Sequence, residues 1–576
     1  MRARAGRTLV VLTLAIGLFA AFANAALAAD TLTPTPVVVT LPAGGSTTVG
    51  KALHLDGLPA RADIIVAIDT TGSMGAALAK AKLDAVDICA DVQAAIPGAR
   101  FAAVEFQDYP TFPYGAPSDS PYELHTPGYT ADCASFSAGV AAMTLGNGVD
   151  FPESNNRVHF EAYSDPALLV SRDPQATRFL VVLADAIPHS IPSFGACQST
   201  SPLSDPGRNG VNESGGGDDI DTPEAIAGLN ADDHTLLYIS YTAGPNAHPC
   251  HEDMAEATGG VAVPDEEAND IGAFIIEQAE ETPFTVDLQV SAGCLLGISF
   301  APSFPQGPFS GEQTISFVET ITAPTVPGSF TCTVTAVMSP GGPTTAVQTV
   351  NVNVTPGPPA TLVLTPATDT NPVDDRHCVT ATVRDAFGNP VPGATVDFST
   401  TGGATPPSGS ATTNASGQAE FCFIGPGLPA TVVITANARG TTASGTATKV
   451  FVLPGSAESC KVTYGGRITA ANGDKATFGG NAKADGLKGN ENYQDHGPAA
   501  DMHVKSSTIL AVTCSRDGTS ASIFGTATVD GAGSFGFRID VRDLGEPGTG
   551  DRYRIRLSNG YDSGDQQLES GNIQIH

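Results

Sequence analysis

Ten cysteines divide this 576-residue chain at regular intervals, and they constrain its fold more than any other feature of the sequence. Pairing each cysteine with its next neighbour gives separations of 44, 53, 38, 44 and 54 residues. Gaps of this regularity favour one disulfide within each stretch of chain. Four cysteines fall within residues 61–282, where three pairings are possible. The expected pairs are Cys89–Cys133, Cys197–Cys250, Cys294–Cys332, Cys378–Cys422 and Cys460–Cys514.

A structural zinc site is the alternative use of these cysteines. No C-x2-C pair occurs in the sequence, although His248-Pro249-Cys250-His251 looks like a metal motif in isolation. The pair His251-Glu252 could begin an H-E-x-x-H motif, but Ala255 stands where the second histidine is needed. The sequence therefore favours disulfides over zinc.

Disulfides imply an oxidising compartment, and the first 29 residues predict export to one. Three arginines precede an apolar stretch over 9–22, and Ala26-Leu27-Ala28 offers small residues for cleavage. No later apolar run reaches the roughly 18 residues that a spanning helix needs, so no transmembrane segment is expected. We predict a secreted protein, extracellular or held at the cell surface. With 28 basic against 60 acidic residues, the chain is also not expected to bind nucleic acid.

The sequence pattern changes near residue 282, which predicts a multidomain chain. Over 61–282, apolar runs such as Ile64-Ile65-Val66-Ala67-Ile68 alternate with helical segments, as in a doubly wound parallel α/β sheet. Later residues form short Thr- and Val-rich runs between turns, in a chain with 63 Gly and 43 Pro, and predict all-β sandwiches. We expect these over 283–355, 360–452 and 456–576. Residues 30–60 are too few for a domain and are expected to complete the sandwich of 283–355, which would then host the α/β domain as an insertion.

Oxygen-bearing side chains follow two of the expected parallel strands. Asp69, Thr71 and Ser73 come directly after one strand, and Asp185 follows another, at the edge where open α/β sheets bind ligands. Glu153, in the loop 146–153, supplies a further carboxylate. Ligands of this kind suit Mg²⁺, or alternatively Ca²⁺ or Mn²⁺, better than zinc or copper.

These residues resemble the von Willebrand factor type A domain and its metal-ion-dependent adhesion site. The resemblance implies that Asp69, Thr71, Ser73, Glu153 and Asp185 surround one Mg²⁺. Asp150-Phe151-Pro152-Glu153 is similar to the corresponding loop of β-integrins, whose hybrid domain hosts such an insertion. Gly148 stands where integrins have Asn, and Gly75-Ala76-Ala77 replaces the acidic pair of an adjacent site. Only the central site is therefore expected.

Two simpler interpretations stand beside the metal site. Strand-end Asp, Ser and Thr residues often only cap the helix that follows. A second acidic cluster, Asp218, Asp219, Asp221 and Glu224, could form a calcium loop, but Thr222-Pro223-Glu224 is also typical of an ordinary helix start. For this second cluster the helix start is favoured.

Two further resemblances lie downstream. Residues 384–393, which read R-D-A-F-G-N-P-V-P-G, together with 413–419, resemble the group-one bacterial immunoglobulin-like (Ig-like) domains of invasin- and intimin-type surface proteins. Gly and Pro in this motif fix a turn between two strands. Residues 492–497 and 545–551 are similar to the post-COAP-type C-terminal β domain of secreted bacterial proteins.

The function expected from these features is metal-dependent adhesion. Mg²⁺ would capture an Asp or Glu carboxylate of a protein or matrix ligand. The alternative is a structural spacer or scaffold of the surface or matrix, with a purely structural metal or none. An enzyme is not expected, because Ser73 lies in no G-x-S-x-G motif and no cysteine is left over as a nucleophile if all ten pair.

Overall fold

The computed structural model describes residues 29–148, 152–189, 193–198, 205–213, 217–241, 247–268, 270–455 and 459–576. The predicted export signal, Ala29 apart, lies outside the described residues, and so do Val149, Asp150 and Phe151. The chain forms two compact units. The first comprises the residues up to Thr40, Ser46–Ala323 and Ser329–Asn353, and the second comprises Leu41–Gly45, Pro324–Gly328 and Val354–His576. The chain is multidomain and mostly β, as predicted.

A six-stranded sheet organises residues 61–282 of the first unit. The strand order is β6-β5-β4-β7-β8-β9, and every neighbouring pair is parallel except β5 with β6, which lies at one edge. Eight of the nine residues of β4 and seven of the eight of β7 are buried, because helices cover both faces of the sheet. The strands are β4 (Arg61–Asp69), β5 (Gly98–Phe106), β6 (Glu123–Leu124), β7 (Thr177–Ala184), β8 (His234–Ser240) and β9 (Ala262–Pro264).

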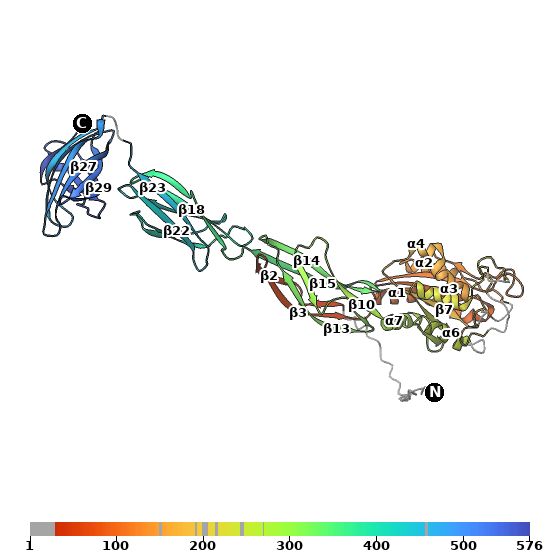
Figure 1. Ribbon diagram of the computed structural model, residues 1–576. Helices are drawn as coiled ribbons and strands as arrows, with labels where there is room; N and C mark the ends of the chain where they lie inside the picture. The colour runs from red at the N-terminus through yellow and green to blue at the C-terminus, as the bar shows by residue number, and fades with distance from the viewer. Residues whose placement is uncertain are drawn as a thin grey trace, which may run out of the picture. The chain divides into compact units, whose positions relative to one another are not determined.

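Two apolar clusters, one on each face of the sheet, assign the helices to their sides (Figure 1). Residues of α1 (Gly75–Ala95), α2 (Cys133–Ala142) and α7 (Ile271–Glu281) belong to one cluster. Residues of α3 (Asn155–Ser164), α4 (Pro166–Ser171), α5 (Thr222–Ala231) and α6 (Ala247–Glu256) belong to the other. The expected apolar stripe of α1 is buried, at Leu78, Ala81, Ala85, Ile88 and Val92.

Helix α6 begins at Ala247, just before the histidine-containing motif of 248–251. Pro249 lies within the first turn of this helix, where a residue without an N–H group costs no intrahelical hydrogen bond. The helix therefore includes the His248-Pro249-Cys250-His251 motif.

The segments on either side of the α/β domain form one sandwich. Strand β3 (Ser46–Leu55) pairs antiparallel with β13 (Gln313–Thr322) over ten residues, from Gln313 opposite Leu55 to Thr322 opposite Ser46. Figure 1 shows β2 and β3, in red, among the green strands of 284–355. One sheet has the order β1-β3-β13-β11 and the other β12-β10-β14-β15-β2. The remaining strands are β1 (Thr31–Thr33), β2 (Val37–Pro42), β10 (Phe284–Val290), β11 (Gly297–Ala301), β12 (Gln306–Phe309), β14 (Gly328–Ser339) and β15 (Gly342–Thr355).

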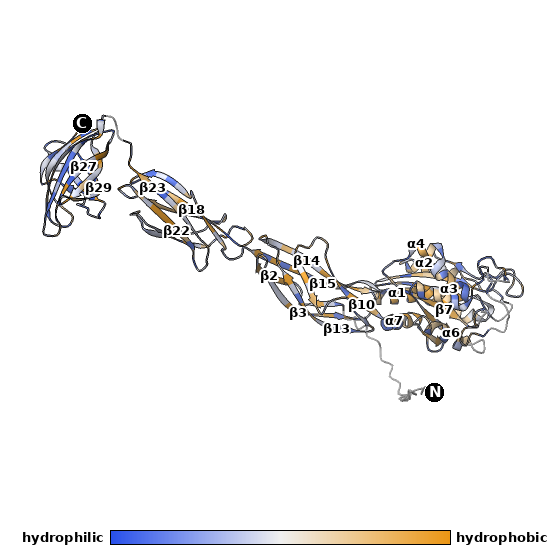
Figure 2. Ribbon diagram, viewed as in Figure 1, coloured by the Kyte–Doolittle hydropathy of each residue, from blue (hydrophilic) through white to orange (hydrophobic). Residues whose placement is uncertain are grey.

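Residues 360–452 of the second unit form a sandwich of a three-stranded and a five-stranded sheet. The orders are β16-β18-β21 and β17-β23-β22-β19-β20. Apolar (orange) and polar (blue) stretches both occur along these strands in Figure 2, as expected where one sheet face is buried. The strands are β16 (Thr361–Thr365), β17 (Thr368–Pro372), β18 (Arg376–Arg384), β19 (Thr395–Thr400), β20 (Ser408–Thr412), β21 (Gln418–Ile424), β22 (Ala430–Ala438) and β23 (Ser444–Val452).

The C-terminal domain is not the expected sandwich of two sheets. Its strands hydrogen-bond in one continuous order, as a single nine-stranded sheet around one apolar core that contains Tyr493 and Tyr553. Its order is β31-β30-β29-β28-β27-β26-β25-β24-β32, so strands consecutive in sequence are mostly neighbours. The strands are β24 (Lys461–Thr469), β25 (Lys475–Lys483), β26 (Lys488–His496), β27 (Asp501–Cys514), β28 (Ser520–Val529), β29 (Ala532–Arg542), β30 (Arg552–Leu557), β31 (Gln566–Gln567) and β32 (Ser570–Ile575).

The five disulfides of the structure are the five expected pairs: Cys89–Cys133, Cys197–Cys250, Cys294–Cys332, Cys378–Cys422 and Cys460–Cys514. Each joins two segments of one domain; Cys378 and Cys422, for example, lie opposite each other on β18 and β21. The structure also decides between the three pairings that the sequence allowed within 61–282.

Candidate metal centre

The first motif sits where β4 ends. Asp69 is the last residue of that strand and is fully buried. Its Oδ1 accepts hydrogen bonds from the Thr71 backbone N–H at 2.9 Å and from the Thr71 hydroxyl at 2.7 Å. The Thr71 hydroxyl lies 3.4 Å from the Ser73 hydroxyl, which is exposed. The turn before α1 therefore brings all three oxygen-bearing side chains together.

Asp185 reaches the same place from the neighbouring strand. It follows β7, which pairs in parallel with β4, so both strands end at one edge of the sheet. Burial raises the pKa of Asp185, and a hydrogen bond from Ser73 opposes that shift. Burial also raises the pKa of Asp69, to about 7, and the negative charge of Asp185 adds to the shift. The two carboxyl groups are close enough to influence each other.

Backbone pairing holds Glu153 against the segment that follows Asp185. Its N–H donates to the Ile187 carbonyl at 2.9 Å, and its carbonyl accepts from the His189 N–H at 3.3 Å. Its side chain faces Gly148: a Cβ added there would lie 3.5 Å from Glu153 Oε1 and 3.4 Å from Thr71 Cγ2. Glu153 and Thr71 therefore approach the same glycine from different loops.

These five residues share one edge of the sheet, which we call the metal edge: Asp69, Thr71, Ser73, Glu153 and Asp185. Among the described residues, Asp69 Oδ2 is buried without a hydrogen-bond partner, which is costly unless something charged or polar meets it. All five side chains offer hard oxygen, so the donor set fits Mg²⁺. Within the described part of the chain, the three carboxylates do not all lie within 4.8 Å of one another, so a shared ion would need water between it and some of them.

Strand β5 carries polar residues at the same edge that the sequence analysis missed. Glu105 and Gln107 are 4 % exposed and Asp108 is 0 % exposed, and the charge of Asp108 contributes to the raised pKa of Asp69. The sequence offered a way to find Gln107 and Asp108. They follow the largely apolar run of 101–106, and polar groups after a parallel strand belong to this edge.

The second acidic cluster divides between two roles. Asp221 caps α5 by accepting from the Glu224 N–H at 2.7 Å, which confirms the helix-start interpretation for these two residues. Asp218 and Asp219 instead gather with Glu213 in an exposed loop. The four residues therefore do not form one calcium loop.

The motif at 248–251 packs α6 against the sheet. Cys250 is in a disulfide, and the His251 ring lies 2.9 Å from the Ser240 hydroxyl and 3.0 Å from the Ala186 carbonyl oxygen. Burial lowers the pKa of His251 to about 4, so the ring is neutral at physiological pH.

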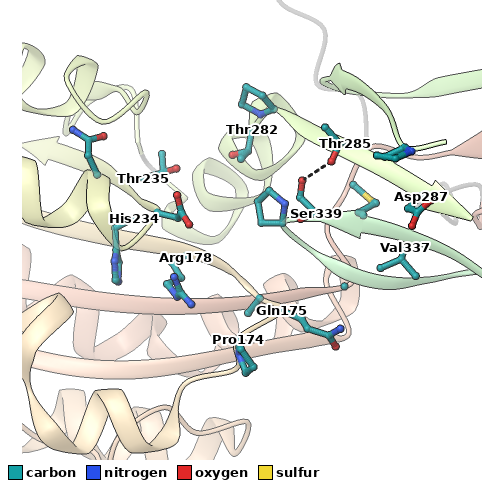
Figure 3. A pocket seen from close by; sticks show the side chains of 18 of the residues that line it. Pro174, Gln175, Arg178, His234, Thr235, Thr282, Thr285, Asp287, Val337 and Ser339 are labelled. Atoms are coloured by element: carbon teal, nitrogen blue, oxygen red, sulfur yellow. Dashed lines mark hydrogen bonds between the residues drawn. The ribbon is translucent and has the colours of Figure 1, made fainter. Parts of the chain in front are cut away.

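The opposite, amino-terminal edge of the sheet borders a cleft of about 730 Å³ between the α/β domain and its host sandwich (Figure 3). Arg178 and His234, at the starts of β7 and β8, line it together with Thr285 and Ser339 from the sandwich. Three of its hydroxyls are already used, since Thr285 donates to the Ser339 carbonyl, and Thr258 and Thr282 donate to carbonyls of the helices that precede them. The cleft therefore offers a ligand fewer free polar groups than its size suggests.

Comparison with known proteins identifies one domain. Residues 360–452 match the bacterial Ig-like domain (group 1) family, which confirms the prediction for that segment. No curated protein matches the sequence significantly.

Among solved structures, the pilus adhesin SpaC from Lactobacillus rhamnosus GG, in its open conformation, is 11% identical over 95% of this chain and 83% of its own, with a TM-score of 0.28. The Escherichia coli adhesin FdeC is 12% identical over 51% of this chain and 85% of its own, with a TM-score of 0.22. The D00-D0 domain of intimin is 18% identical over 29% and 85%, with a TM-score of 0.20. TM-scores this low do not establish a common fold over those lengths.

Proposed function

We propose that this chain is a secreted or surface-held adhesion protein whose α/β domain, of the von Willebrand factor type A class, binds Mg²⁺ at the metal edge. The observation that carries the proposal is that Asp69, Thr71, Ser73, Glu153 and Asp185 lie at one edge of the sheet, where Asp69 Oδ2 is buried without a hydrogen-bond partner. The strand order, with one antiparallel strand at the edge, agrees with this class.

When bound, Mg²⁺ would supply a hard Lewis-acid centre for an anionic oxygen. Thr71 holds the carboxylate of Asp69 in place through two hydrogen bonds to Oδ1, which leaves Oδ2 for the ion or its water. Ser73, the exposed member of the set, lies on the solvent side, where a ligand would approach.

The partner that fits this domain presents a carboxylate on an otherwise basic surface. Residues 61–282 contain 34 acidic and 8 basic residues, so the domain repels acidic surfaces at long range. Basic residues around the captured Asp or Glu would speed association, and added salt would slow it. An acidic partner would show the opposite salt dependence.

The test combines calorimetry with capture. Mg²⁺ is titrated into the mature wild-type chain and into Asp69→Ala, and capture of matrix and cell-surface proteins is compared in Mg²⁺ and in EDTA. We expect Mg²⁺ binding and metal-dependent capture for the wild type alone. Equal capture by the wild type, by Asp69→Ala and in EDTA would refute the proposal.

One observation favours the second candidate, a structural spacer. The three carboxylates of the metal edge, all in the described part of the chain, do not all lie within 4.8 Å of one another, and much of the chain consists of disulfide-bonded β domains. A spacer would capture no ligand through this edge, with or without Mg²⁺. Neither candidate requires enzymatic activity.

The proposed location rests on the five disulfides, which suit an oxidising compartment. In the described part of the chain, no helix is long and apolar enough to cross a membrane.

A further inference from the structure

Strand β5 ends in a group of buried polar residues that the metal-edge residues alone do not explain. Gln107 and Asp108 follow its last residue, Phe106, and both are at least 96 % buried. Burying an amide and a carboxylate is costly unless each finds partners, so their contacts indicate what they are for.

The side chain of Gln107 joins the first motif to the loop that begins at residue 144. Its Nε2 donates to the Thr70 hydroxyl at 3.0 Å and to the Thr144 carbonyl at 3.1 Å. Thr70 lies between Asp69 and Thr71, and the Gly146 N–H donates to the Thr70 carbonyl at 2.9 Å. These hydrogen bonds fix the turn at Thr70, between Asp69 and Thr71 of the metal edge.

The backbone of Gln107 holds the loop of Glu153. Its carbonyl oxygen accepts from the hydroxyl of Ser154, the next residue, at 2.5 Å and from the Ser154 N–H at 3.3 Å. A Cβ added at Gly146 would lie 2.5 Å from the Gln107 amide, so the 146–148 loop passes directly over it. The turn after β4 and both ends of the loop between α2 and α3 therefore contact one residue.

Asp108 contacts the remaining loop. Its Oδ1 lies 3.2 Å from Nε2 of His189, and the His189 N–H donates to the Glu153 carbonyl. In the parallel register of β4 and β5, Asp69 lies opposite Phe106, so Asp108, two residues further on, lies at the same edge of the sheet as Asp69. Asp108 thus adds negative charge behind the metal edge without belonging to its ligand set.

We propose that Gln107 and Asp108 are positioning residues of the metal edge, Gln107 by fixing two of its loops and Asp108 by supplying a charge behind Asp69. This inference rests on the proposed Mg²⁺ site. Groups that orient ligands in this way typically change metal affinity by about 10- to 100-fold when they are replaced.

The two roles predict different results with two ions, Mg²⁺ measured by calorimetry and Tb³⁺ measured by luminescence. In the mature full chain, Gln107→Leu should weaken both ions by a similar factor, about 10-fold or more, because it disturbs geometry. Asp108→Asn keeps the shape and an acceptor for His189 but removes a charge. Its effect should scale with ion charge, so that a 10-fold loss for Mg²⁺ becomes roughly a 30-fold loss for Tb³⁺.

Matched controls lie at the other end of α1. Gln93→Leu removes an amide that donates to the Ala99 and Ala131 carbonyls, roughly 27 Å along the helix from Gly75. Asp132→Asn removes an acid that caps α2, where Asn caps equally well. Neither control should change the affinity for either ion, and unfolding temperatures of all variants report on folding.

The outcomes separate this inference from the proposed function. Unchanged affinities in Gln107→Leu and Asp108→Asn, beside a wild type that binds Mg²⁺, overturn the inference alone. Equal losses of Mg²⁺ and Tb³⁺ in Asp108→Asn overturn the charge role. A wild type that binds neither ion overturns the proposed function and this inference with it. If Gln107→Leu does not fold, Asp108→Asn still decides, because it preserves size and hydrogen bonding.

Discussion

The two edges of the α/β sheet treat charge in opposite ways. At the metal edge, Asp69 and Asp185 lie close enough for each negative charge to act on the other. At the amino-terminal edge, Asp232 is held by two cations: Arg172 donates to its carboxylate at 2.7 Å, and Arg178 donates to its backbone carbonyl at 2.7 Å. One edge concentrates like charges, whereas the other neutralises its acid.

This difference shows that buried charge destabilises the domain at the metal edge. Burial raises the pKa of Asp69 to about 7, so an ionised Asp69 destabilises the domain unless a cation is bound. At the amino-terminal edge, Arg172 and Arg178 neutralise Asp232 without a ligand. A site whose cost a ligand removes is the more plausible functional one.

The largest expected effect separates the edges by function. Asp69→Ala should abolish Mg²⁺ binding and metal-dependent capture, because it removes the acid at the centre of the metal edge. Asp287→Ala, at the cleft by the opposite edge, removes the same charge and should leave both unchanged. Calorimetric titration with Mg²⁺ checks both variants, and a loss of binding in Asp287→Ala would remove the functional distinction between the edges.

The next effect concerns stability without metal. The pKa of Asp69 is raised in the folded state, so this group favours folding less as pH rises through about 7. Asp69→Asn should therefore raise the free energy of unfolding at pH 8 in EDTA by about 2–4 kcal/mol. Asp232→Asn should lower it, since Arg172 and Arg178 lose a partner.

Calorimetric unfolding of the mature chain in EDTA tests this pair. The same chemical change is expected to have opposite signs at the two edges, and equal signs would show that the edges do not differ electrostatically.

A smaller effect appears at low pH. Burial lowers the pKa of His234, by the cleft, and of His251, near the metal edge, to about 4. The unfolded chain binds protons near pH 6.5 and the folded chain does not, so stability falls from about pH 6.5 down to about 4. Each histidine should cost about 2 kcal/mol at pH 5, while Asp69 contributes in the opposite direction.

Unfolding measured from pH 7 to 4.5 tests this expectation. His234→Gln should flatten the pH dependence, and an unchanged slope in that variant would show that His234 is not one of the groups responsible.

The smallest effect concerns Asp221, which the sequence analysis considered as a member of a calcium loop. Asp221→Ala should cost about 1 kcal/mol, because it removes the cap of α5. Ca²⁺ should stabilise the wild type and this variant equally. Thermal unfolding with and without Ca²⁺ is the measurement, and a Ca²⁺-dependent stabilisation lost in the variant would restore the calcium-loop interpretation.

Part of the metal edge could be predicted from local sequence. The continuous apolar run of β4 and the periodic apolar stripe of α1 identify a strand and a helix, and three of the oxygen donors stand between them in the chain. The position of Gln107 at this edge could be inferred, because it follows an apolar strand, but its contacts could not. Its partners Thr70, Thr144 and Ser154 lie 37, 37 and 47 residues away, and no local pattern records which of these residues will meet.

The sequence by itself determined the local features: the Ig-like turn motif of 384–393, the cysteine spacing, and an oxygen-only donor set. Each depends on residues close together in the chain, where propensity and side-chain chemistry act directly. The sequence also indicated that 30–60 joins the sandwich of 283–355, but only the tertiary structure decided that β3 pairs with β13, more than 250 residues later, and that Glu153 meets Thr71 at Gly148. Closing such distances costs chain entropy, which only burial and hydrogen bonding in the assembled fold offset, and no local pattern records which segments will meet.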